Sequence, residues 1–66
     1  MNIKNYIIQN FKNDDINKIK DAIDEAVKEY DEDTLPGLGI FFMLVWEKSD
    51  DIEKNTILER LKSNLK

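Results

Sequence analysis

The chain has 66 residues, with 14 acidic and 10 basic side chains, a net charge of −4, and neither histidine nor cysteine. This length predicts one small domain, residues 1–66, with a limited core, and it excludes a two-domain enzyme. Without cysteine there are no disulfides, thiolate zinc sites or cysteine nucleophiles, and without histidine the commonest general base and metal ligand is missing. We therefore expect a non-enzymatic protein with no cofactor and no metal site.

The acidic residues are concentrated between residues 13 and 33. This segment carries nine acids and three lysines, a local charge of −6, whereas residues 50–66 are neutral. Binding to phosphate backbones depends on clustered lysine and arginine that displace counterions, and the sequence has no such cluster. We therefore expect no nucleic acid partner.

Neither secretion nor a membrane is indicated. Polar residues interrupt the first six positions, unlike the apolar stretch of a signal peptide, so we expect a cytoplasmic protein that is not secreted. The continuous apolar run Ile40–Trp46 is far shorter than the roughly 20 residues of a membrane-spanning helix.

Two amphipathic helices are predicted in the first half of the chain. The first, residues 2–12, has Asn2 as its cap and apolar residues at helical spacing: Ile3, Tyr6, Ile7 and Phe11. The second, residues 14–31, is predicted to be capped by Asn13 or Asp14. Its apolar stripe is Ile16, Ile19, Ile23, Ala26, Val27 and Tyr30.

The third segment, residues 36–48, contains the run Ile40–Trp46, which is apolar on every face. Periodicity alone cannot distinguish a buried strand from a buried helix, but no other segment alternates with the period of two that a pairing strand needs, so we predict a helix. Pro36 suits its first turn, with Thr34 or Leu35 as the cap. The segment Leu35-Pro36-Gly37-Leu38-Gly39 is interpreted as a tight turn with close backbone packing, because it is too short for a phosphate-binding loop.

A fourth amphipathic helix is predicted over residues 50–65. Asp50 with Glu53 three residues later is a capping-box variant. Its apolar stripe is Ile57, Leu58, Leu61 and Leu65, with Ile52 near the start. The predicted fold class is all-α, a small four-helix bundle with the wholly apolar third helix as its core.

Candidate polar sites have simpler structural interpretations. The acidic connector Asp31-Glu32-Asp33 lacks the spacing of a calcium loop and is interpreted as a solvated face. Asp50 and Asp51 lie at a helix cap and point in different directions, which does not suit a proton-sharing pair.

The third helix is the best candidate for an interface. Its aromatic residues lack the basic flanks of a base-stacking surface, so core or protein contact is favoured. Six consecutive apolar residues, 41–46, cannot all face one core. The possible interface residues are Phe41, Phe42, Met43, Val45 and Trp46. A homodimer and a compact monomer closed by Trp46 both remain open at this point.

The sequence also resembles a known family. The most specific motif is L-P-G-L-G-x-x-F followed four residues later by tryptophan, here Leu35, Pro36, Gly37, Leu38, Gly39, Phe42 and Trp46. With Glu25-Ala26-Val27 before it and a charged helix after it, this pattern is similar to the small acid-soluble spore protein I family. Two departures mark a divergent member: Met43 stands where relatives typically carry an acid, and Tyr30 lies near a position that is usually small.

The resemblance implies a place and a time rather than a reaction. It implies a minor small acid-soluble protein made in the developing forespore, kept in the spore core, and distinct from the abundant type that coats DNA. The alternative is a small acidic interaction module or sporulation regulator that docks on an unidentified protein through the third helix.

Overall fold

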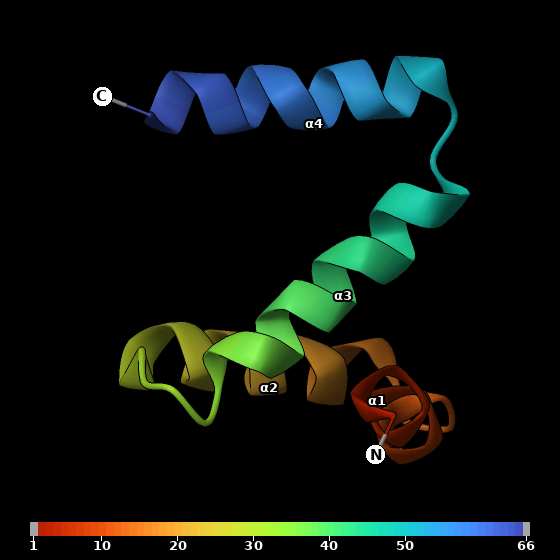
Figure 1. Cartoon of the computed structure of the whole chain (residues 1–66), viewed down its shortest axis with the longest axis vertical. Helices are drawn as coiled ribbons and strands as arrows, with labels where there is room; N and C mark the ends of the chain where they lie inside the picture. The colour runs from red at the N-terminus through yellow and green to blue at the C-terminus, as the bar shows by residue number, and fades with distance from the viewer. Residues whose placement is uncertain (1, 66) are drawn as a thin grey trace.

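A computed structural model describes residues 2–65 and shows four α-helices (Figure 1). They are α1 (Ile3–Phe11), α2 (Ile16–Glu29), α3 (Leu35–Lys48) and α4 (Asp51–Asn64). The all-α class is confirmed, because no strand occurs in residues 2–65 and the apolar run Ile40–Trp46 lies within α3. None of the helices in this part of the chain is both long and apolar enough to cross a membrane.

Short polar side chains begin three of the helices. Asn2 Oδ1 accepts the N–H of Asn5 at 3.2 Å, as predicted for α1. At α4 the predicted capping box is confirmed: Asp50 accepts the Glu53 N–H at 2.8 Å, and Glu53 accepts the Asp50 N–H at 3.0 Å. These bonds satisfy backbone donors that have no partner inside the helix.

The predicted cap residue of α2 was wrong by one or two positions. The cap is Asp15, which accepts the Lys18 N–H at 3.0 Å, rather than Asn13 or Asp14. The Asp14 N–H donates to the Phe11 carbonyl at 3.1 Å in the turn that ends α1. Because Asp14 still belongs to that turn, the extended backbone of a cap first occurs at Asp15.

The connection from α2 to α3 is ordered by its own polar groups. Tyr30 ends α2 with a φ of 49° and is the one non-glycine with positive φ in residues 2–65. Asp31 Oδ1 then accepts the N–H groups of Asp33 (2.9 Å) and Thr34 (3.0 Å). Thr34 is the cap residue of α3, as predicted, but its hydroxyl donates back to the Asp31 carbonyl and caps no N–H of α3.

The predicted glycine turn is wrong, because Gly37 and Gly39 lie inside α3 and neither has a positive φ. The reversal of the chain occurs upstream, at residues 30–34, so Pro36 already occupies the first turn of the helix. A Cβ on Gly37 would lie 3.7 Å from Ile7 Cδ1, an ordinary contact. At Gly39 such an atom would meet nothing within 4 Å in the described part of the chain.

Helix α3 packs on both α1 and α2. The rings of Phe41 and Phe11 contact each other, Ile40 is buried, and Lys4 Nζ binds Glu47 at 2.9 Å. Ile40 is the single buried apolar residue among residues 2–65. The packed part of the molecule is therefore a small three-helix unit of α1, α2 and α3.

Helix α4 does not complete the expected bundle around α3. Figure 1 shows it leaving the end of α3 as a separate arm, on the far side from α1 and α2. Lys54 Nζ lies 5.2 Å from the Trp46 ring centroid and Ile57 is half-buried, but the other apolar residues of α4 are exposed. Two residues, Ser49 and Asp50, connect α3 to α4. Because this connection is short, α4 cannot reach α1 or α2 unless the backbone angles of Ser49 and Asp50 change.

Candidate interaction surface

One side of α3 remains uncovered. Phe42, Met43 and Val45 are exposed, whereas Phe41 and Trp46 are half-buried. Residues on consecutive positions of a helix point about 100° apart, so α1 and α2 can cover one side of this apolar helix and leave the other in solvent. Of the five candidate interface residues, Phe41 thus packs against Phe11 of α1 and Trp46 stacks on Phe42, whereas Phe42, Met43 and Val45 are exposed.

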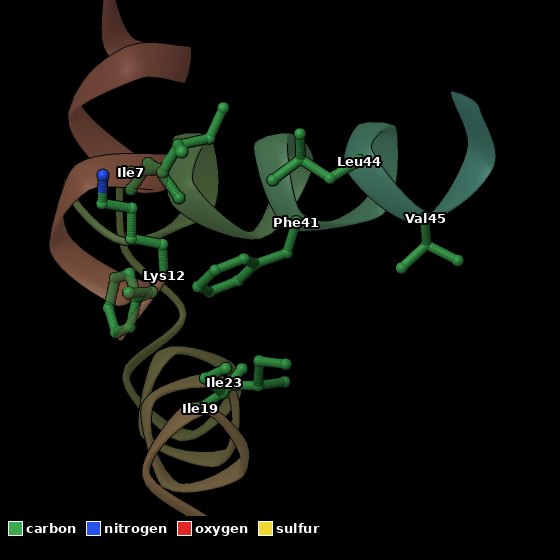
Figure 2. Close-up of a pocket in the computed structure, with 9 residues that line it drawn as sticks. Ile7, Lys12, Ile19, Ile23, Phe41, Leu44 and Val45 are labelled. Atoms are coloured by element: carbon green, nitrogen blue, oxygen red, sulfur yellow. The ribbon is translucent and has the colours of Figure 1, made fainter. Parts of the chain in front are cut away.

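An apolar groove runs along α3 where α1 and α2 approach it. Figure 2 shows Phe41 of α3 reaching toward Lys12, with Ile19 and Ile23 on the facing helix. The groove has a volume of about 320 Å³. Eight of its nine lining residues are apolar and the ninth is Lys12: Ile7, Ile8, Phe11, Lys12, Ile19, Ile23, Phe41, Leu44 and Val45.

A second apolar hollow continues this groove toward α4. Its volume is about 300 Å³, and it shares Ile23, Phe41 and Val45 with the first. The remaining lining residues are Leu38, Phe42 and Ile57. We call the two hollows together the apolar trough. It offers burial for apolar side chains rather than polar groups for a reaction.

The most specific sequence motif, from Leu35 to Trp46, lies on α3 and contributes side chains to the trough. Phe42 and Trp46, four residues apart, stack with ring centroids 5.8 Å apart and an interplanar angle of 24°. The Lys54 ammonium lies over the Trp46 ring, so the stack also supports the start of α4. Leu38 lines the trough. The motif therefore builds α3 and its contacts with neighbouring helices.

The acidic residues form no candidate metal site in the part of the chain that the structure describes. In residues 2–65 no group of three or more carboxylates lies close enough to hold a metal ion. Asp31 and Asp50 accept backbone N–H groups. Lys20 donates to Asp24 at 2.7 Å, and this hydrogen bond raises the pKa of the exposed Lys20.

Only part of the predicted apolar stripe of α2 is covered by other helices. Ile19, Ile23 and Ala26 are half-buried, but Ile16, Val27 and Tyr30 are exposed. Only α3 packs strongly against α2, so the flanks of the stripe have no covering helix. Nothing in the spacing of the apolar residues indicates this, because periodicity identifies a face but not the width of its neighbour.

Comparison with known proteins identifies the family. The family model described as small, acid-soluble spore protein I matches residues 1–65. The chain belongs to the small acid-soluble spore protein I family. This confirms the resemblance carried by the motif from Leu35 to Trp46.

Relatives in this family match the whole length of the chain at low identity. The small, acid-soluble spore protein I of Bacillus velezensis is 33% identical over 66 residues, which cover 100% of this chain and 93% of that protein. Proteins of the same name from Bacillus cereus and Bacillus anthracis are each 31% identical over 65 residues, covering 98% of this chain and 94% of theirs. No solved structure matches this chain.

Proposed function

We propose that the protein is a non-enzymatic minor small acid-soluble spore protein, made in the forespore and kept in the spore core. The observation that carries this proposal is the family match over residues 1–65. The names of the Bacillus relatives attribute spore occurrence and solubility in acid to those proteins. A sequence with 14 acids and no cysteine is compatible with extraction in acid, because protonated carboxylates leave a chain with a net positive charge.

The absence of catalysis is supported by the chemistry of the surface. The trough is lined by apolar side chains, with Lys12 at one edge, and offers no nucleophile with a base beside it. The acidic side chains with assigned partners hold helix ends, turns or surface ion pairs. Such groups stabilise backbone structure and do not surround a substrate.

The location can be tested in the bacterium that encodes the protein. The chain, fused to a fluorescent protein at its native locus, is expected to appear in the forespore after engulfment and not in the mother cell. Acid extracts of broken, decoated spores should contain the untagged chain. Recovery only from vegetative cells or from the spore coat would contradict the proposal.

A second candidate function is a protein interaction module that docks through α3. The observation that favours it is the exposure of Phe42, Met43 and Val45 on a helix that carries no charged side chain from residue 35 to residue 46. Chemical crosslinking in intact spores should then give a defined adduct with the native chain and none with Val45→Glu. Equal adducts from both chains would argue against docking through α3.

A further inference from the structure

The folded chain exposes far more surface than its mass requires. Its accessible surface is 5897 Å² for a mass of 7.8 kDa. A compact monomer of this mass exposes about 4,400 Å², so the excess is about 1,500 Å² per chain. If a second copy covered this excess on each chain, the interface would bury about 3,000 Å² in total, which lies within the range of obligate homodimers.

Much of the uncovered apolar surface lies on α4. Leu58, Leu61 and Leu65 are 48%, 47% and 66% exposed. They follow Lys54 at steps of four, three and four residues, which places Lys54, Leu58 and Leu61 on one face of α4 and Leu65 at the end of the same row, as the residue that caps the helix. Lys54 lies over Trp46 of the same chain. The face that contacts α3 at the start of α4 therefore continues as a leucine stripe beyond the reach of α3.

The leucine stripe matches the apolar trough in chemistry, and its own spacing is that of a helix that binds a groove. Anchors at positions i, i+3 and i+7 are the pattern by which an amphipathic helix binds a hydrophobic groove. Leu58, Leu61 and Leu65 have this spacing. The trough extends across α3 through Ile23, Phe41 and Val45, and so it can receive more than one anchor.

None of Leu58, Leu61 and Leu65 lines the trough of its own chain. Ser49 Oγ donates to the Val45 carbonyl at 2.6 Å, and Asp50 begins α4 through the capping box. Both residues of the connection thus take part in helix-end hydrogen bonds. Figure 1 shows the end of α4 far from α1.

We propose that the protein completes its fold as a symmetric dimer in which α4 of each copy lies in the apolar trough of the other. The leucine stripe and the trough are both present on every chain, so a twofold axis pairs each stripe with a trough and leaves no open end. This goes beyond the proposed spore function, which does not depend on it. It names a second copy as the partner and α4 as the element that binds.

The proposal predicts a specific response to salt. Each chain has a net charge of −4, so two copies repel each other at long range while the contact itself is apolar. Added salt screens this repulsion and should strengthen the dimer. A basic partner bound by the acidic surface would show the opposite response.

Sedimentation of the full chain tests the proposal with a matched pair of variants. Leu61→Glu places a charge in the middle of the stripe, whereas Ile52→Glu places the same charge on the opposite face of α4, at a residue that is 80% exposed. We expect a dimer for the native chain and for Ile52→Glu, and at least a tenfold higher dissociation constant for Leu61→Glu. A native monomer at high micromolar concentration in high salt, or equal effects of both variants, would overturn the proposal.

Engineered cysteines distinguish exchange between chains from closure within one chain. The native chain has no cysteine, so Val45→Cys and Leu61→Cys each provide a single thiol. Mixing these two variants under mild oxidation should give a disulfide-linked heterodimer. If instead a chain carrying both substitutions forms only an internal disulfide at the concentration used for sedimentation, α4 folds onto its own trough and the dimer is ruled out. Forespore location of Leu61→Glu would show that the spore function stands whichever result is obtained.

Discussion

Phe11 and Phe41 meet edge to face, with ring centroids 5.1 Å apart and planes inclined by 72°. Phe11 is the last residue of α1 and Phe41 lies in the middle of α3, so this contact joins two helices that are distant in sequence. The same two rings line the apolar groove. One aromatic pair therefore contributes both to the stability of the three-helix unit and to the wall of the surface that we propose as an interface.

Replacing Phe11 by alanine should destabilise the protein by about 2 kcal/mol. This is less than the cost of truncating a fully buried phenylalanine, because Phe11 is half-buried. Urea denaturation followed by circular dichroism at low protein concentration measures the change. Tyr6→Ala, at an exposed aromatic of the same helix, is the control and should change the unfolding free energy much less. Equal losses would mean that the aromatic pair has no special role.

Replacing Tyr30 by glycine should stabilise the protein by about 1 kcal/mol. Tyr30 has a φ of 49°, a conformation that costs a residue with a Cβ about 1 kcal/mol or more but costs glycine little. The midpoint of thermal unfolding should rise by several degrees for a domain of this size. Tyr30→Ala keeps the Cβ and should bring no such gain. A gain shared by both variants would place the effect in the tyrosine ring instead of the backbone.

Removing the cap of α4 should loosen this helix and leave the others in place. Loss of an Asp cap costs about 1 kcal/mol, and α4 has little tertiary contact within its own chain to offset it. For Asp50→Ala at concentrations where the chain is monomeric, we expect faster amide exchange in residues 51–64 and unchanged exchange in α3. Asp51→Ala, one residue further on, removes a carboxylate without removing the cap. Its effect should be smaller.

Alanine should be accepted at both glycines of α3. Gly39 faces open space in the described part of the chain, and glycine inside a helix is about 1 kcal/mol less favourable than alanine. Gly39→Ala should therefore raise the unfolding free energy by up to this amount, measured by urea denaturation of the monomer. Gly37→Ala brings a methyl group to ordinary contact with Ile7 and should also fold. Loss of dimer without loss of stability in Gly39→Ala would indicate that a second chain passes close to this position.

Duplex DNA should not bind the protein at about 150 mM salt. The acids of α2 gather on its surface at Asp21, Asp24 and Glu25, beside Lys28. A gel-shift titration with the native chain is expected to show no complex. Replacing the three acids by lysine reverses the sign of the net charge and should produce salt-sensitive binding. Saturable micromolar binding by the native chain would revive a role in coating DNA.

Local signals predicted most of the fold. Asn2 and the Asp50–Glu53 pair mark helix starts through hydrogen bonds to residues three positions away, so a short stretch of sequence contains all the information. The helical state of residues 40–46 was also predictable, because no segment offered a strand to pair with. The cap of α2 was misplaced because several acceptors occur in a row and only the end of the preceding turn selects among them.

The candidate surface was predictable only in part. A helix whose central run is apolar on every face must leave some apolar residues exposed, and the sequence identified that helix. Which side chains face outward depends on where α1 and α2 contact α3, and those contacts join residues far apart, such as Lys4 and Glu47. The direction of α4 depends on the backbone of Ser49 and Asp50, for which amphipathic periodicity contains no information. The trough therefore emerged only from the structure.

The short connection at Ser49 and Asp50 also has a consequence for the lifetime of the chain. Because α4 makes few contacts with α1–α3 in its own chain, it can unwind while the three-helix unit stays folded. An unwound α4 presents an extended segment that fits the active site of a protease, whereas α1–α3 does not. In the monomer, digestion should therefore begin in residues 51–64 and remove the leucine stripe first. Each cleaved chain would then lose the ability to pair, so that limited proteolysis would convert an assembled protein into single chains before the rest is degraded.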